Sequence, residues 1–147
     1  MIPLAVPACT AADLKPLPAL LQGATGSMLG GVAFRNVSSR RCLVGGRPHV
    51  TFVLRRHVVP TEVEAFPSSV GGRAVRTIRP GRRAGVYLQW ANWCGAWPAG
   101  ALLRTVRVRL VLTTGVRLTT RVRTGRARCD APSEPSRLYV SAFTLTR

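Results

Sequence analysis

The four cysteines have the best-defined chemistry in this sequence. They stand at Cys9, Cys42, Cys94 and Cys129. An even number of widely spaced thiols is typical of disulfides, whereas zinc sites usually carry ligands in pairs two to four residues apart. No Cys-x-x-Cys is present, and His49 and His57 do not complete a zinc set. Three pairings are open, and sequential pairing would close loops of roughly 35 residues, each contributing about 3.5–4 kcal/mol. Buried free thiols are the alternative, but we expect two disulfides, no metal and an oxidising compartment.

Side chains suited to acid–base catalysis are scarce. The chain has two histidines and five carboxylates, at Asp13, Glu62, Glu64, Asp130 and Glu134. Glu62 and Glu64 would share a face of a strand, but the nearby Pro60 favours an edge position, where carboxylates are solvated. His57 follows two arginines, and no Ser or Cys nucleophile can be tied to either histidine. This inventory predicts no enzymatic activity, no catalytic residue and no cofactor.

The segment 105–124 alternates apolar residues with arginine. If residues 113–115 form a three-residue loop with Gly115 at the positive-φ position, Leu112 faces Val116 across a β-hairpin. A two-residue loop would instead pair Leu112 with Arg117 and mix the two faces, so we favour the longer loop. The same register gives one face made of three cross-strand pairs, namely Leu110 with Leu118, Val108 with Thr120, and Val106 with Val122.

The other face of this hairpin is cationic. It carries five arginines, at Arg107, Arg109, Arg117, Arg121 and Arg123. Arg107 lies directly opposite Arg121, and such a like-charge pair costs up to about 1 kcal/mol, which a fold tolerates. Two interpretations are therefore open, a solvated strand face or a face that binds anions. No aromatic residue shares this face, which argues against stacking of single-stranded bases.

Three tryptophans form the remaining candidate site. Trp90 shares the apolar face of a strand with Val86 and Leu88, so we expect it in the core. Trp93 adjoins Cys94 and is expected to pack on a disulfide. Trp97, in the loop 95–100, is the tryptophan expected to be exposed, where it would bind a ligand or partner or pack locally.

The charge balance restricts the possible partners more than any motif does. Lys and Arg number 22 and Asp and Glu five, which gives a formal net charge of +17. Such an excess favours nucleic acid, anionic lipid surfaces or acidic envelope polymers, although an Arg-rich composition of the source genome would also produce it. No run approaches the roughly 20 apolar residues that span a bilayer.

The chain reads as strands separated by turns, which is typical of a sandwich or barrel. Expected strands are 28–37, 49–56 and 84–90, with 58–66 as an edge strand or loop, 67–72 as a loop and 79–81 as a turn. One helical turn is expected at 10–13, where Thr10 precedes Asp13 by three residues as in a capping box. Its 147 residues fit one domain. We expect residues 1–8 to be a residual leader or linker and 9–147 a single all-β sandwich domain; an export signal is not visible in this chain.

The order of several short motifs resembles a known family, the actinobacterial secreted domain of unknown function 4232. The motifs are Cys9-Thr10 with Leu14, Gly23-Ala24-Thr25-Gly26, Asn36-Val37-Ser38, Cys42 with Gly46-Arg47-Pro48 and Val50, Pro80-Gly81 with Ala84, Trp90-Ala91-Asn92-Trp93-Cys94, Cys129-Asp130, and Leu138, Val140-Ser141 and Phe143. The resemblance implies an immunoglobulin-like antiparallel β-sandwich with disulfides Cys9–Cys42 and Cys94–Cys129. It also implies a secreted or cell-envelope location, and no assigned ligand or catalytic residue.

We therefore expect a non-catalytic extracytoplasmic binding or structural domain. As a binding domain, it would use the five hairpin arginines, and Trp97, to engage an anionic envelope polymer, a lipid surface or an envelope protein. As a structural module it would have no ligand at all. The alternative function is a cytoplasmic protein that binds nucleic acid or another polyanion, which predicts reduced cysteines and steep salt dependence.

Overall fold

Alternating sequence patterns become β-strands with one buried face. The computed structural model describes residues 5–65, 75–97 and 103–146. In β10 (Arg83–Ala91), Val86, Leu88 and Trp90 are buried, and in β11 (Arg104–Val111) every second residue is buried. This period of two is what a pleated strand requires when one face packs on a core.

Among the described residues, the fold is all-β apart from one short helical turn. Its elements in chain order are η1 (Ala11–Asp13), β1 (Leu14–Pro16), β2 (Ala19–Leu20), β3 (Gln22–Ala24), β4 (Ser27–Asn36), β5 (Cys42–Gly45), β6 (His49–Leu54), β7 (His57–Val58), β8 (Glu62–Ala65), β9 (Val75–Ile78), β10, β11, β12 (Arg117–Thr124), β13 (Arg137–Val140) and β14 (Thr144–Thr146). The prediction of an all-β chain is confirmed.

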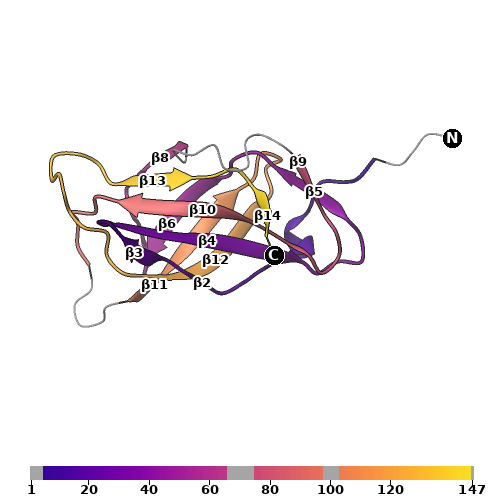
Figure 1. Cartoon of the computed structure of the whole chain (residues 1–147), viewed down its shortest axis with the longest axis horizontal. Helices are drawn as coiled ribbons and strands as arrows, with labels where there is room; N and C mark the ends of the chain where they lie inside the picture. The colour runs from indigo at the N-terminus through magenta and orange to yellow at the C-terminus, as the bar shows by residue number, and fades with distance from the viewer. Residues whose placement is uncertain (1–4, 66–74, 98–102, 147) are drawn as a thin grey trace.

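The strands form two large sheets and one small one. The seven-stranded sheet has the order β1-β4-β10-β13-β8, with β3 beside β4 and β14 beside β10. The five-stranded sheet has the order β2-β12-β11-β6-β7, and β5 pairs with β9. Figure 1 shows β4, β10 and β13 in one layer and β6, β11 and β12 in the layer behind it, crossing obliquely.

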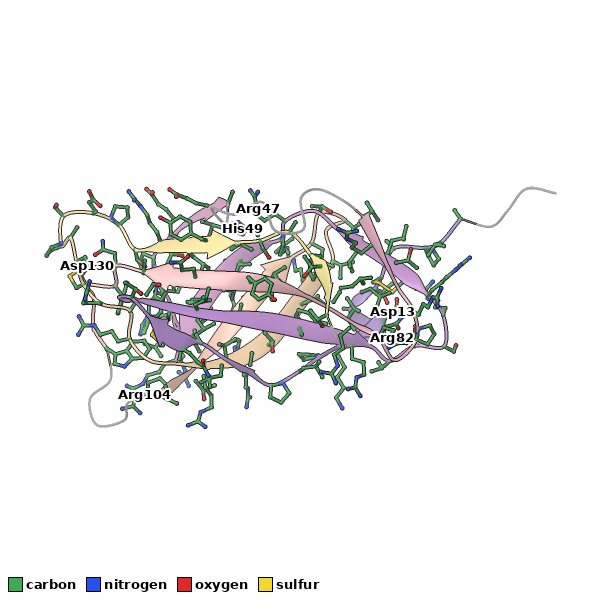
Figure 2. The ribbon with its side chains drawn as sticks, in the orientation of Figure 1. Asp13, Arg47, His49, Arg82, Arg104 and Asp130 are labelled. Carbon is green, nitrogen blue, oxygen red and sulfur yellow. A yellow bond between two sulfur atoms is a disulfide. The ribbon has the colours of Figure 1, made fainter. Side chains whose placement is uncertain are left out.

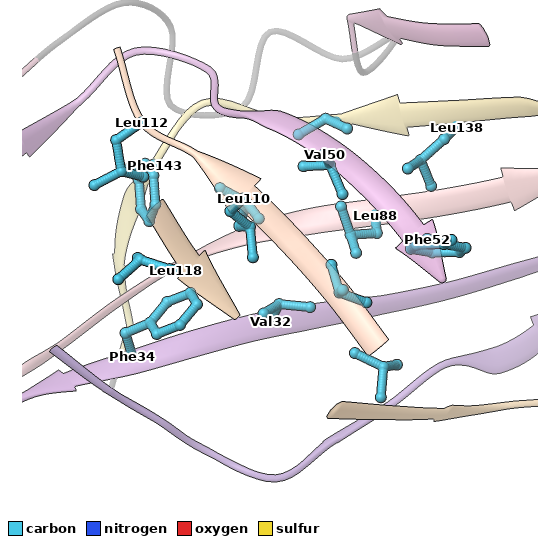
Figure 3. Packing of buried hydrophobic residues seen from close by; sticks show 14 of the residues in the cluster. Val32, Phe34, Val50, Phe52, Leu88, Leu110, Leu112, Leu118, Leu138 and Phe143 are labelled. Carbon is cyan, nitrogen blue, oxygen red and sulfur yellow. The ribbon is translucent and has the colours of Figure 1, made fainter. Parts of the chain in front are cut away.

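The core lies between the two large sheets. Val32, Phe34 and Leu88 from one sheet belong to the same buried cluster as Phe52 and Leu110 from the other (Figure 3). Phe52 also meets Trp90 edge to face, with ring centroids 5.6 Å apart. Trp90 is therefore the core residue that the sequence predicted, and its indole Nε1 donates a 2.8 Å hydrogen bond to Ser136 Oγ.

Most of the predicted elements are confirmed with boundaries one or two residues different. The strands expected at 28–37, 49–56 and 84–90 are β4, β6 and β10, and the helical turn at 10–13 is η1. The run 58–66 is split at Pro60 into β7 and β8, which both lie at sheet edges. The turn at 79–81 is present with Gly81 at φ +80°. The predicted loop 67–72 lies outside the described residues.

Two edge pairings depart from the expected antiparallel sandwich. β2 pairs with β12 in parallel, and β8 pairs with β13 in parallel. Each short strand is far from its partner in the sequence, so no hairpin joins the two. This is what parallel pairing requires, because parallel strands cannot be connected by a tight turn. Gly30 makes room where the chain crosses between sheets, since a Cβ there would clash with the Leu20 carbonyl oxygen and crowd Leu21 Cδ2 at 2.9 Å.

Asn36 fixes the end of β4. It is fully buried, and its Nδ2 donates to the carbonyl oxygens of Arg40 and Ile78 at 2.8 and 2.9 Å. Its Oδ1 accepts hydrogen bonds from the backbone and the hydroxyl of Ser38. The side chain therefore ties β4 to the loop that leads to Cys42 and to the end of β9.

Replacing Asn36 with Ala should lower the free energy of unfolding by about 2–3 kcal/mol, because the buried Ile78 carbonyl loses its partner. Ser39→Ala, at a nearby exposed position, should change it by less than about 0.5 kcal/mol. Chemical denaturation of both variants measures the difference. Equal stabilities would show that the Asn36 hydrogen bonds do not hold this corner.

Candidate anion-binding face

The β11–β12 hairpin has the register that the sequence predicted. Arg107 is opposite Arg121, Leu110 is opposite Leu118, and the Leu112 backbone N–H donates to the Val116 carbonyl oxygen at 2.8 Å. Gly115 closes the turn at φ +89°, in the left-handed region that favours glycine. The three-residue loop is therefore confirmed.

The outer face of this hairpin carries exposed guanidinium groups. All five predicted arginines, Arg107, Arg109, Arg117, Arg121 and Arg123, are exposed, and we call them the arginine face. Their strand neighbours Val106, Val108 and Val122 are buried at 1% or less. Because side chains alternate across a strand, burial of the valines directs the arginines away from the core.

The five-stranded sheet that carries the arginine face contains no carboxylate. None of the residues of β2, β6, β7, β11 and β12 is Asp or Glu. The three ion pairs among the described residues are Arg40–Asp13, Arg128–Asp130 and Arg137–Glu134. None of them uses the arginine face, so its five charges are not neutralised by carboxylates of the described chain.

A shallow hollow adjoins the centre of this face. It has a volume of about 400 Å³ and is lined by Arg107, Thr119 and Arg121 together with the segment 16–18. The opposed Arg107 and Arg121 therefore lie beside a depression. An anionic group placed there would meet two guanidinium groups and the Thr119 side chain.

The tryptophans form a separate cluster away from this hollow. Trp97 is half-buried, and its ring centroid lies 5.8 Å from that of Trp90; the Trp93 ring is 6.1 Å from Trp90. Trp93 and Trp97 line an apolar hollow of about 460 Å³ with Leu54 and Val58. The expected exposure of Trp97 is thus only partial, because the ring packs on the core. Its role in binding stays a prediction.

The polar groups considered for acid–base chemistry are exposed and belong to strands of two different sheets. His49 and His57 are exposed, at the start of β6 and in the edge strand β7. Glu62 and Glu64 are exposed on the edge strand β8, where they pair in register with Arg137 and Tyr139 of β13. His57 lines the hollow that contains Trp93 and Trp97, whereas Glu62 lines a neighbouring hollow beside Cys94.

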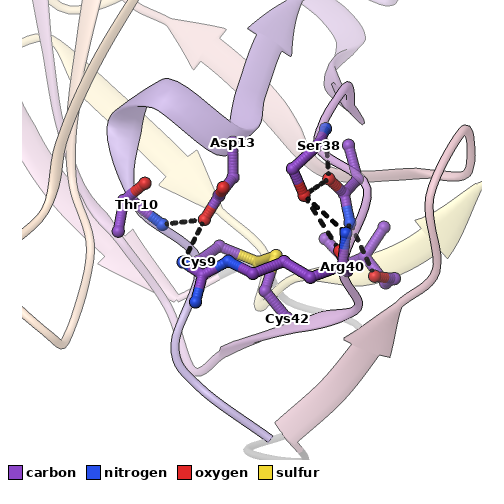
Figure 4. The surroundings of a disulfide bond; sticks show 8 residues. Cys9, Thr10, Asp13, Ser38, Arg40 and Cys42 are labelled. Atoms are coloured by element: carbon purple, nitrogen blue, oxygen red, sulfur yellow. Dashed lines mark hydrogen bonds and ion pairs between the residues drawn. A yellow bond between two sulfur atoms is a disulfide. The ribbon is translucent and has the colours of Figure 1, made fainter.

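The two disulfides lie at opposite ends of the sandwich. Cys9 is bonded to Cys42 and Cys94 to Cys129, with 4.8 Å between the Cα atoms in each pair. Figure 2 shows Asp130, the neighbour of Cys129, at one end and Asp13 at the other, and Figure 4 shows Asp13 beside the Cys9–Cys42 bond. Since all four thiols are oxidised, none remains to bind zinc, and an oxidising environment is indicated.

Asp13 reinforces the first disulfide. Its Oδ2 accepts hydrogen bonds from the Thr10 backbone N–H at 2.8 Å and from Arg40 Nη2 at 2.9 Å. The Thr10 hydrogen bond, followed by that of Arg40, holds the pKa of Asp13 below its usual value. This is the capping box that the spacing of Thr10 and Asp13 indicated.

Asn92 is a residue whose importance sequence reasoning missed. It lies at φ +60° before the second disulfide, and its Oδ1 accepts from the backbone N–H groups of Asp130 and Ala131 at 3.0 and 2.8 Å. Its Nδ2 donates to the Ala131 carbonyl oxygen at 3.0 Å. The side chain therefore holds the loop after Cys129, and the motif Trp90–Cys94 was the available signal.

Together these features define a disulfide-bonded, all-β domain with a cationic sheet. The chain belongs to the family described as Domain of unknown function (DUF4232), whose model matches residues 9–144. The match spans all four cysteines and both strands of the arginine hairpin. No curated protein and no solved structure matches the chain. Within the described residues there is no helix of the length and hydrophobicity needed to cross a bilayer.

Non-reducing peptide mapping by mass spectrometry, on protein recovered from its native host, should find peptides linked through Cys9–Cys42 and Cys94–Cys129. The reason is that both pairs are in contact in the fold and persist in an oxidising compartment. A sample alkylated after reduction is the control. Four free thiols in the unreduced sample would contradict the expected location.

Proposed function

We propose that this protein is a non-catalytic, extracytoplasmic binding domain that engages an anionic polymer of the cell envelope through the arginine face. The observation that carries the proposal is a sheet with five exposed arginines and no carboxylate in its strands. Arginine's planar guanidinium forms paired hydrogen bonds with phosphate and carboxylate groups, which are the charged groups of such polymers.

The spacing of the charges supports a polymer more than a single small anion. Residues two apart on a strand and residues on neighbouring strands place side chains about 5–7 Å from one another. These separations are below the Debye length of about 8 Å at physiological salt, so the five guanidinium groups act on one ligand collectively. A flexible chain of phosphates or carboxylates can contact several of them at once.

The surroundings favour an envelope polymer over nucleic acid. The outer face of β6, β11 and β12 carries no Phe, Tyr or Trp on which bases would stack. The two disulfides favour an oxidising compartment, where nucleic acid is not the usual polyanion. An immunoglobulin-like arrangement, which the family resemblance suggested, would suit such an envelope module.

Absence of catalysis is part of the proposal. The strands β6 and β7, which carry the exposed His49 and His57, contain no Ser or Cys, and the carboxylates Glu62 and Glu64 belong to the other large sheet. Catalysis requires proton carriers held in a common site, and a binding face does not. The apolar hollow lined by Trp93 and Trp97 remains a candidate contact for a protein partner.

The double substitution Arg107→Glu/Arg121→Glu should weaken binding to immobilised polyphosphate by about tenfold at low salt. It should also reduce the slope of log Kd against log salt concentration by about 2, because two phosphate contacts are lost. Like charges still oppose each other in this variant, so the denaturation midpoint should stay close to that of the parent. Binding isotherms at several salt concentrations measure both effects.

Arg47→Glu/Arg126→Glu is the matched control, since both side chains are exposed and lie outside β11 and β12. Each exchange removes two units of charge, so either double variant falls from +17 to +13. The control should lose about twofold or less. Equal losses in the two variants would show that net charge, and not the arginine face, determines binding. Tighter binding of single-stranded DNA than of polyphosphate by the parent would favour the nucleic-acid alternative.

A further inference from the structure

A second cationic surface lies away from the arginine face. It is a hollow of about 600 Å³, and five arginines line it, at Arg41, Arg76, Arg79, Arg82 and Arg83. We call it the arginine hollow. Its volume falls in the range of ligand-binding pockets, which is about 300–1,000 Å³, so it is large enough for more than one phosphate group.

The fold assembles this hollow from distant parts of the chain. Arg41 precedes β5, Arg76 belongs to β9, Arg83 begins β10, and Thr146 ends β14. Pairing of β5 with β9 and of β14 with β10 brings these segments together. In the sheet register, Arg83 of β10 pairs with Thr146 on one side and with Arg35 of β4 on the other. Arg35 therefore adds a further cation next to the hollow.

The hollow has the polar groups of an anion site and no acidic side chain. No Asp or Glu is among its lining residues, and none of its five arginines takes part in the three ion pairs of the described residues. Thr146 Oγ1, in the lining, is a buried atom with no hydrogen-bond partner. A buried hydroxyl without a partner is costly, and an anion oxygen in the hollow would accept a hydrogen bond from it.

The arginine hollow and the arginine face lie on opposite sides of the sandwich. Ala84, next to Arg83, is 1% exposed and belongs to the core between the sheets, so Arg83 points to the outer side of the seven-stranded sheet. The arginine face occupies the outer side of the five-stranded sheet. Figure 2 shows Arg82 at the end of the molecule where Asp13 also lies.

We propose that the arginine hollow is a second anion-binding site, which takes phosphate groups, and that the protein bridges two anionic polymer chains through its two sites. This inference rests on the proposed function for the first site. Packed sheets are about 10 Å apart, so two chains bound on the outer sides are separated by more than a Debye length and repel each other weakly. A single protomer can then cross-link an anionic matrix.

The test uses short polyphosphate chains labelled with either a donor or an acceptor fluorophore, too short to reach both sites. The parent protein, shown to be monomeric by sedimentation, should produce energy transfer between chains and bind two chains per protomer. Arg79→Glu/Arg82→Glu should lose the transfer and bind one chain, at the arginine face. Arg47→Glu/Arg126→Glu, with the same change of charge, should keep both properties.

The outcomes separate the two proposals. Unchanged transfer in Arg79→Glu/Arg82→Glu would show that the arginine hollow is not the second site, and a parent that binds one chain would overturn the bridge. Neither result contradicts binding at the arginine face. If Arg107→Glu/Arg121→Glu binds two chains as the parent does, the arginine face is not one of the two sites and the proposed function fails. Loss of transfer in both variants, each still binding one chain, is the result that the bridge predicts.

Discussion

The fold depends on burial of the apolar face of the β11–β12 hairpin against the seven-stranded sheet. Val106, Val108 and Leu110 are 1% exposed or less, and they share a core with Leu88 and Trp90. Because a strand alternates its side chains, this burial also decides where every arginine between those residues points. A one-residue slip of the register would bury five guanidinium groups, at a cost that no partner in the core could offset. The packing of the core thus creates the cationic surface.

Charge segregation follows from the same arrangement and gives the surface its chemistry. The chain has only five carboxylates, and two of them form ion pairs at the ends of the molecule. Asp13 binds Arg40 beside the first disulfide, and Asp130 pairs with Arg128 beside the second. Consequently the strands of the five-stranded sheet carry cations and no carboxylate. The disulfides close loops of 33 and 35 residues at opposite ends, which restricts the unfolded chain and holds both cationic surfaces on a rigid frame.

Local patterns predicted the parts of this structure that depend on local physics. The alternation of residues 105–124 and the position of Gly115 fixed the hairpin register, and the spacing of Thr10 and Asp13 indicated the capping box. The parallel pairing of β2 with β12 and the convergence of Arg41, Arg76 and Arg83 depend on contacts between distant segments, which no periodicity in one sequence encodes. Asn36 and Asn92 were visible only as parts of family motifs, because their roles lie in hydrogen bonds to backbone groups far along the chain.

The most direct test is an NMR titration that follows the arginine Nε–Hε and tryptophan indole resonances as short polyphosphate is added to the folded, disulfide-bonded protein. Binding through the sheet predicts large shifts at the five arginines of the arginine face, Arg107, Arg109, Arg117, Arg121 and Arg123. The second site predicts additional shifts at the arginines of the arginine hollow, and the indoles of Trp93 and Trp97 should change less. Shifts concentrated at the tryptophans, with the five hairpin arginines unchanged, would contradict the central claim that the carboxylate-free sheet is the anion-binding surface.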